Sequence, residues 1–104
     1  SILSVIKPKG GVSYAVSKSA LQAQTSCLAK ELGSLSITCN LIGLSIFESE
    51  MSNRVHDAFI EEVLAQQSIK RYAQLEDVTN LIDFFARPQS SFVTGQAVFL
   101  GGVS

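Results

Sequence analysis

The chain has 104 residues, enough for one small domain, and its formal net charge is −1. So small a charge gives no electrostatic attraction to nucleic acid or to an anionic membrane surface, and we expect neither as a partner. Hydrophobic residues make up 46% of the sequence and charged residues only 16%. For so short a chain, this composition predicts that another chain covers part of the apolar surface.

We expect a cytoplasmic protein, because no apolar run reaches the ~18 to 20 residues of a transmembrane helix and no signal peptide pattern is present. Cys27 and Cys39 lack CxxC spacing and stand in apolar surroundings, which predicts buried free thiols in a reducing compartment. His56 is the single histidine. It argues against a histidine-based metal cluster and against a Ser-His-Asp triad, so no metal site is expected.

The first third of the chain predicts one long helix. Residues 1–6 are an apolar run that could end a strand, and residues 7–11 contain Pro and Gly and predict a loop. Val12 to Leu32 then predicts the helix, with Gly33 as the residue that stops it. Two stripes of this helix are apolar or small, which indicates burial against its own sheet and against a neighbour. The first contains Tyr14, Lys18, Leu21, Thr25, Leu28 and Leu32, and the second Val16, Ala20, Ala23 and Cys27.

Two short strands follow in the predicted order of elements. Residues 36–42 are β-branched and apolar, as in a buried parallel strand, and residues 43–51 leave it as a loop. Residues 97–100 predict the last strand, which Gly101-Gly102 ends.

Two helices are predicted between these strands. Val55 to Ile69 is amphipathic, and a second helix begins at a cap formed by Gln74 or its neighbour and stops before Pro88. The side chains expected to be buried are Val55, Phe59, Val63 and Leu64 in the first and Val78, Leu81, Ile82 and Phe85 in the second. Helix, strand, helix, helix, strand is the order of part of a parallel α/β sheet.

Tyr14 and Lys18 stand one turn apart on the same face of the long helix. A phenol, with a pKa near ~10, is a poor acid at neutral pH, but a nearby ammonium group lowers that pKa towards the working range. The pair could therefore pass a proton to or from a carbonyl or alcohol oxygen. The alternative is that Tyr14 is a half-buried helix aromatic and Lys18 a solvated charge.

With these residues the chain resembles the C-terminal part of a short-chain dehydrogenase/reductase, closest in pattern to the 3-oxoacyl-(acyl-carrier-protein) reductases. Five features match in order: Tyr14-Ala15-Val16-Ser17-Lys18; Ser1, thirteen residues before Tyr14; the helix end and strand at 28–32 and 37–40; Phe47 to Met51; and Phe92 to Gln96 running on to Gly101-Gly102. The resemblance covers residues 1–104 and implies the catalytic C-terminal portion of one Rossmann-type, doubly wound parallel sheet domain, incomplete in this chain.

The resemblance implies a role for each matching residue. Tyr14 would protonate a carbonyl oxygen as hydride arrives from the nicotinamide, and it would also contact the cofactor. Lys18 would lower the pKa of Tyr14 and bind the nicotinamide ribose, and Ser1 would hold the substrate oxygen. Phe47 and Ser49 belong to the segment that would bind the nicotinamide carboxamide. The implied cofactor is NADP or NAD, and the implied substrate is a small-molecule or acyl-carrier-bound carbonyl that is reduced to an alcohol.

The sequence departs from the family in two ways. Leu44-Ser45 stand where the family usually has Pro-Gly, which changes the backbone options of the loop beside the nicotinamide and bears on cofactor affinity. The Gly-rich phosphate-binding turn of the family's N-terminal half is absent from these 104 residues. We therefore expect the chain to act only with that half, supplied as a separate chain or a lost segment.

Two classes of function remain open. One is the reductase, and the other is a non-catalytic interaction or assembly subunit derived from the same family. Ser1, Tyr14 and Lys18 together favour the enzyme, because a scaffold has no need of all three. In the family the helix matching residues 12–32 packs on its counterpart in another subunit, which implies a homo-oligomer built through that helix.

Overall fold

The computed structural model describes residues 11–47 and 57–102, with the side chains of residues 11–15, 57 and 59 left aside. The elements, in order, are α2 (Gly11–Leu32), η2 (Gly33–Leu35), β1 (Leu41–Gly43), α4 (Asp57–Gln66), α5 (Leu75–Ala86), η3 (Pro88–Ser90), β2 (Ala97–Phe99) and η4 (Leu100–Gly102). The predicted order of helix, strand, helix, helix and strand is confirmed. Among these residues, no helix is long and apolar enough to cross a membrane.

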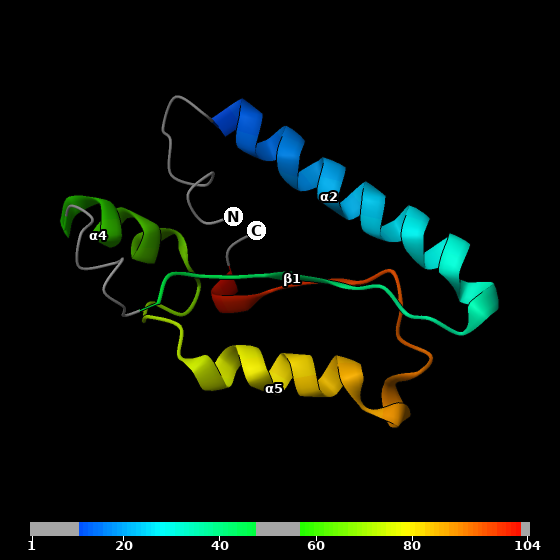
Figure 1. Ribbon diagram of the computed structural model, residues 1–104. Helices are drawn as coiled ribbons and strands as arrows, with labels where there is room; N and C mark the ends of the chain where they lie inside the picture. Colours follow the sequence, from blue (N-terminus) through cyan, green and yellow to red (C-terminus); the bar gives the residue numbers. More distant parts are fainter. Residues whose placement is uncertain (1–10, 48–56, 103–104) are drawn as a thin grey trace.

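The two strands form a parallel pair between helices. Leu41 pairs with Ala97, and Gly43 pairs with Phe99 at the carboxyl ends of the two strands. Helices α2 and α5 lie on opposite sides of the pair, and α4 lies beyond the carboxyl ends of the strands (Figure 1). One layer of helix on each side of parallel strands is the arrangement of a doubly wound sheet.

Side chains extend the pairing of the strands beyond their ladder. The Asn40 side chain donates from Nδ2 to the Val93 carbonyl (3.1 Å) and accepts from the Gln96 amide at Oδ1 (3.1 Å). The Cys39 amide donates to Thr94 Oγ1 (3.0 Å). These bonds explain why the predicted strand of residues 36–42 is shorter as a strand: Leu41–Gly43 forms the ladder, while residues 39 and 40 are bound mainly by side chains and single backbone bonds.

One face of α2 is buried and the opposite face is exposed. Thr25 and Ala29 are buried, and Lys18 and Leu32 are half-buried, so this face lies towards the strands. The small-residue stripe, which we define as Val16, Ala20, Ala23 and Cys27, is exposed in this chain. The prediction that Cys27 is a buried thiol is therefore wrong for the chain by itself, while Cys39 is half-buried. Cover by a neighbour remains a prediction.

The apolar core is small. Ile46, from the segment after β1, packs with Ile60 and Val63 of α4, and Leu64 and Tyr72 flank this cluster. Burial of Val63 confirms the amphipathic pattern predicted for α4. The described helix is shorter than the predicted Val55 to Ile69, ending at Gln66, and residues 55 and 56 lie outside the described part of the chain.

Two further expectations are corrected. No residue of α5 is buried: Val78, Leu81 and Phe85 are half-buried and Ile82 is exposed, because the described part of the chain offers α5 only two strands. Leu32 does end α2, but Gly33 begins a 3-10 turn, and the left-handed residue is Ser36 (φ 59°).

Candidate functional site

The segment that leaves β1 is bound at three consecutive residues. Ser45 donates a hydrogen bond from its hydroxyl to Gln67 Oε1, and the Ile46 carbonyl accepts from the Ala73 amide (2.8 Å). Phe47 then forms a single parallel bridge with Ala73. The chain is therefore fixed on residues 67–73 up to Phe47, where the segment predicted to contact a nicotinamide begins.

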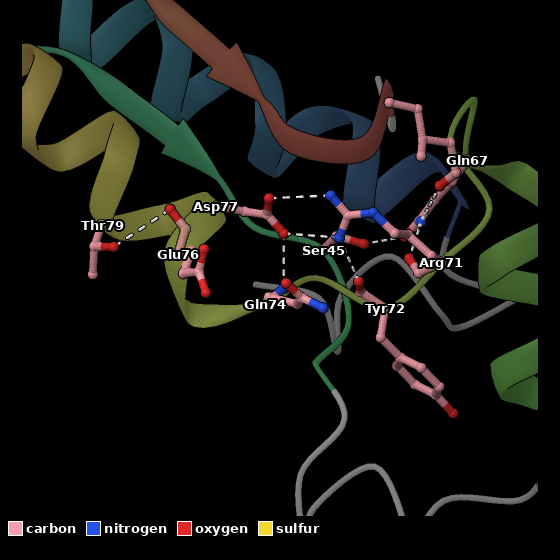
Figure 2. Close-up of polar contacts among 9 residues, drawn as sticks. Ser45, Gln67, Arg71, Tyr72, Gln74, Glu76, Asp77 and Thr79 are labelled. Carbon is pink, nitrogen blue, oxygen red and sulfur yellow. Dashed lines mark hydrogen bonds and ion pairs between the residues drawn. The ribbon is translucent and has the colours of Figure 1, made fainter.

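Gln67 is the most deeply buried large side chain among the described residues, with 2% of its surface exposed. Its amide nitrogen donates to two carbonyls, of Ile69 (2.9 Å) and Arg71 (3.1 Å), while its oxygen accepts from Ser45. Both amide hydrogens and the oxygen thus have protein partners in place of water. Figure 2 shows Gln67 beside Ser45 and Arg71.

The turn after β2 packs against the same residues. The Gly101 carbonyl accepts from the amides of Ser68 (2.9 Å) and Ile69 (3.1 Å). Gly101 has φ 76°, and a Cβ there would lie 3.3 Å from Gln67 Nε2. Glycine at this position therefore permits both the left-handed turn and the close approach to Gln67.

An ion pair joins the end of this segment to α5. Arg71 donates from both Nη atoms to the Asp77 carboxylate, at 2.9 and 3.1 Å (Figure 2). The hydrogen bond from Arg71, and after it that from the Gln74 amide, lowers the pKa of Asp77 from 3.8 to about 2. Gln74 and Asp77 also complete a capping box, so the cap predicted at Gln74 is confirmed.

Lys18 contacts the end of β2. Its Nζ lies 4.3 Å from the centroid of the Phe99 ring, and the ring covers Gly43, where a Cβ would overlap it. Phe99 is the last residue of β2, so the ammonium group lies at the carboxyl end of the strand pair. Open α/β sheets bind their ligands at that end of the strands.

The sequence-predicted site residues are only partly within the described chain. Ser1 and Ser49 lie outside the described residues, and Tyr14 lies in α2 with its side chain outside the description. Lys18 and Phe47 are described, and both lie at the carboxyl end of the strands. The grouping of Tyr14 with Ser1 and Ser49 therefore stays a prediction.

Sequence reasoning missed Gln67 and treated Ser45 only as a departure from the family. A signal was present, because Gln67 follows Ile60, Val63 and Leu64 at the spacing of one apolar helix face. A polar residue on such a face predicts a buried side chain with specific partners. The contact of Phe99 with Gly43 could not be predicted in this way, since the pairing depends on the register of the two strands.

Residues 11–47 and 57–102 contain no Gly-rich turn between a strand and a helix for phosphates. Contact of Lys18 and Phe47 with a nicotinamide and its ribose stays a prediction. A separate pocket of about 220 Å³ is lined by Ser45, Arg71, Asp77, Asn80 and Gly101, among others. It is smaller than most ligand pockets, at about 300 Å³ or more, and its two charges are paired with each other.

Comparison with known proteins decides the family. A family model described as enoyl-(acyl carrier protein) reductase matches residues 1–103. The chain belongs to the short-chain dehydrogenase/reductase family. The 3-oxoacyl-(acyl-carrier-protein) reductase of Staphylococcus epidermidis is 28% identical over 98% of this chain, and that of Rickettsia bellii is 31% identical. The chain spans about 42% of the length of these relatives.

Solved structures of short-chain dehydrogenase/reductases confirm the predicted fold class. A Serratia marcescens family member, a double mutant, has a TM-score of 0.77 and 32% identity over 94% of this chain and 40% of its own. A blue fluorescent protein from a metagenomic library, in complex with NADPH, has a TM-score of 0.71 and 31% identity over 86% of this chain and 36% of its own. The family uses NADP or NAD, as the resemblance implied.

Proposed function

We propose that this chain forms the catalytic C-terminal part of an NAD(P)-dependent reductase that converts a carbonyl group to an alcohol, acting with an N-terminal dinucleotide-binding half. The observation that supports this most is the position of Lys18, half-buried at the carboxyl end of the strand pair and one helical turn from Tyr14. A cation at this place, one helical turn from a tyrosine in the same helix, suits acid–base chemistry.

A dinucleotide bound with its nicotinamide near Lys18 and Phe47 would supply the hydride for the carbonyl carbon. The Tyr14 hydroxyl gives its proton to the carbonyl oxygen, and the Lys18 ammonium stabilises the phenolate that remains. Ser1 donates a hydrogen bond to the same oxygen, which stabilises the negative charge that develops there. Phe47 and Ser49 orient the nicotinamide from the segment after β1.

The substrate we propose is a 3-oxoacyl thioester, since the curated relatives carry that name. The family description names an enoyl substrate instead. Assays of NADPH oxidation with a 3-oxoacyl and an enoyl thioester distinguish the two.

Tyr14→Phe in the assembled protein tests the mechanism. The change removes one hydroxyl, so we expect carbonyl reduction to be lost while the far-ultraviolet circular dichroism, which reports the fold, is unchanged. Lys30→Ala, at an exposed lysine near the other end of α2, is the matched control and retains activity. If turnover of Tyr14→Phe stayed within tenfold of the original, a barrier change of ~1.4 kcal/mol, Tyr14 would not be the proton donor.

A non-catalytic assembly subunit is the second candidate, and the exposed apolar surface favours it. Val16 is 63% exposed, Leu75 72% and Phe92 fully exposed, and such apolar side chains suit contact with other chains. An assembled protein that binds neither NADPH nor NADH, judged by the fluorescence of the reduced nicotinamide, would support this candidate over the enzyme.

A further inference from the structure

We propose that Ser45 and Gln67 form a latch that fixes the exit of β1 and so positions Phe47 for the nicotinamide, an inference that rests on the proposed function. In this chain a side-chain hydrogen bond takes the part that Pro-Gly has in the family pattern. Ser45 and Gln67 are thus positioning residues, and the departure at Leu44-Ser45 does not remove cofactor binding.

The first support is burial combined with complete pairing. Ser45 is 3% exposed and Gln67 is 2% exposed, so neither can exchange its partner for bulk water. The Ser45 hydroxyl donates to Gln67 Oε1, and Gln67 Nε2 donates to the Ile69 and Arg71 carbonyls. A buried polar group costs free energy unless it is bonded, so each partner requires the other.

The second support is the place of the latch in the chain. Leu44 is 49% exposed, so its side chain does little to fix the loop by packing. The fixed positions are Ser45, by its side chain, and then Ile46 and Phe47, by bonding to Ala73. Proline fixes a backbone angle and glycine permits a close approach. Here the bond to Gln67 supplies the restraint, and Gly101 permits the close approach of the turn after β2 to Gln67 and Ser45.

The third support is what Gln67 connects. Its amide joins the exit of β1 to the turn at residues 69–71. The backbone amides of Ser68 and Ile69, at the start of that turn, donate to the Gly101 carbonyl after β2. One side chain therefore sets the exits of both strands relative to each other. Loss of the Gln67 amide would leave the Ser45 hydroxyl and the Ile69 and Arg71 carbonyls without this partner. The segment between β1 and Phe47 would then no longer be held in place.

The test is a double-mutant cycle of Ser45→Ala and Gln67→Met in the assembled protein, with NADPH and NADH as probes. Each single change leaves a buried group without a partner, and we expect the Kd for NADPH to rise about tenfold in each. The double variant lacks the same hydrogen bond as each single variant, so the two losses are not expected to add, and its Kd is expected to stay within about threefold of that of Gln67→Met. Hydrogen exchange at the Ala73 amide, which reports the bond to Ile46, is expected to follow the same pattern.

Two control variants separate positioning from general loss of stability. Gln66→Met changes the neighbouring, exposed glutamine, and Ser90→Ala changes another buried serine, in η3. Both are expected to leave the Kd unchanged, even where urea unfolding shows that Ser90→Ala lowers stability. A double variant that binds no more weakly than Gln67→Met is the outcome that two independent structural losses would not produce.

The results divide cleanly. Single variants that bind NADPH as tightly as the original, or a double variant whose Kd rises by the product of the two single increases, overturn the latch. An original protein that binds neither NADPH nor NADH overturns the proposed function, and the positioning of a nicotinamide fails with it. In that case, hydrogen exchange at the Ala73 amide still shows whether Ser45 and Gln67 fix the exit of β1.

Discussion

At the scale of single residues, Phe99 links a glycine in one strand to a cation on a helix. Its ring lies over Gly43, its direct partner in β1, and the Lys18 ammonium lies 4.3 Å from the ring centroid. A ring packed over a strand glycine fills the space that a side chain would take. A cation over the ring face is attracted by about 0.5–1 kcal/mol at partly exposed sites. The register of two strands therefore positions the proposed catalytic lysine.

Gly43→Ala tests this arrangement. A Cβ at Gly43 would overlap the Phe99 ring, so the ring must move and the contact with Lys18 is lost. We expect a loss of about 1–3 kcal/mol in the unfolding free energy of the assembled protein, measured in urea, together with lower turnover. Gly33→Ala is the control, since nothing lies within 4 Å of a Cβ there. Equal stability of the two variants would contradict the packing.

At the scale of elements, α5 is the one whose limits the sequence predicted best. Gln74 caps it, Glu76 and Asp77 lie in its first turn, and Ala86 ends it before Pro88. These signals are local, because caps and proline act within one turn of the chain. The candidate site, in contrast, is built from pairs of residues that are far apart in the sequence, which local signals do not predict. Gln67 with Ser45 joins residues far apart in sequence, and such pairs follow from the register and the turn after β2.

The Arg71–Asp77 pair makes the start of α5 sensitive to acid. The folded-state pKa of Asp77 is about 2, below its ordinary 3.8, mainly through the hydrogen bond from Arg71. Its contribution to stability is therefore present above about pH 4 and is lost as pH falls towards 2. Asp77→Asn is expected to flatten the decline in stability between these pH values. Asp83→Asn, on the same helix, is the control in urea unfolding at pH 4.5 and 2.5. Parallel pH curves for the original and Asp77→Asn would contradict the assignment.

At the scale of the whole molecule, the chain is more open than a compact domain. Its radius of gyration is 15.3 Å, whereas a compact chain of this length has about 13 Å. Its extents are 47 × 30 × 22 Å. Among the described residues, buried apolar side chains are few, and large ones such as Leu35 and Phe92 are exposed. This surface is what the apolar composition predicted, and we infer that other parts of the fold or other subunits cover it.

The small-residue stripe of α2 is the face that we expect a second subunit to cover. Its members, Val16, Ala20, Ala23 and Cys27, lie opposite the face that contains the buried Thr25 and Ala29, since successive residues turn by roughly 100° around a helix. Small side chains allow two helices to approach closely.

Ala23→Arg is therefore expected to break the oligomer of the assembled protein, because an unpaired charge would be buried at the contact. Turnover should fall as well, since the helix that carries Tyr14 and Lys18 loses its support. Gln22→Arg adds the same charge one residue away, on an exposed position turned from the stripe, and should leave the oligomer intact. Light scattering measures the mass of each variant. An unchanged mass for Ala23→Arg would place the subunit contact on another surface.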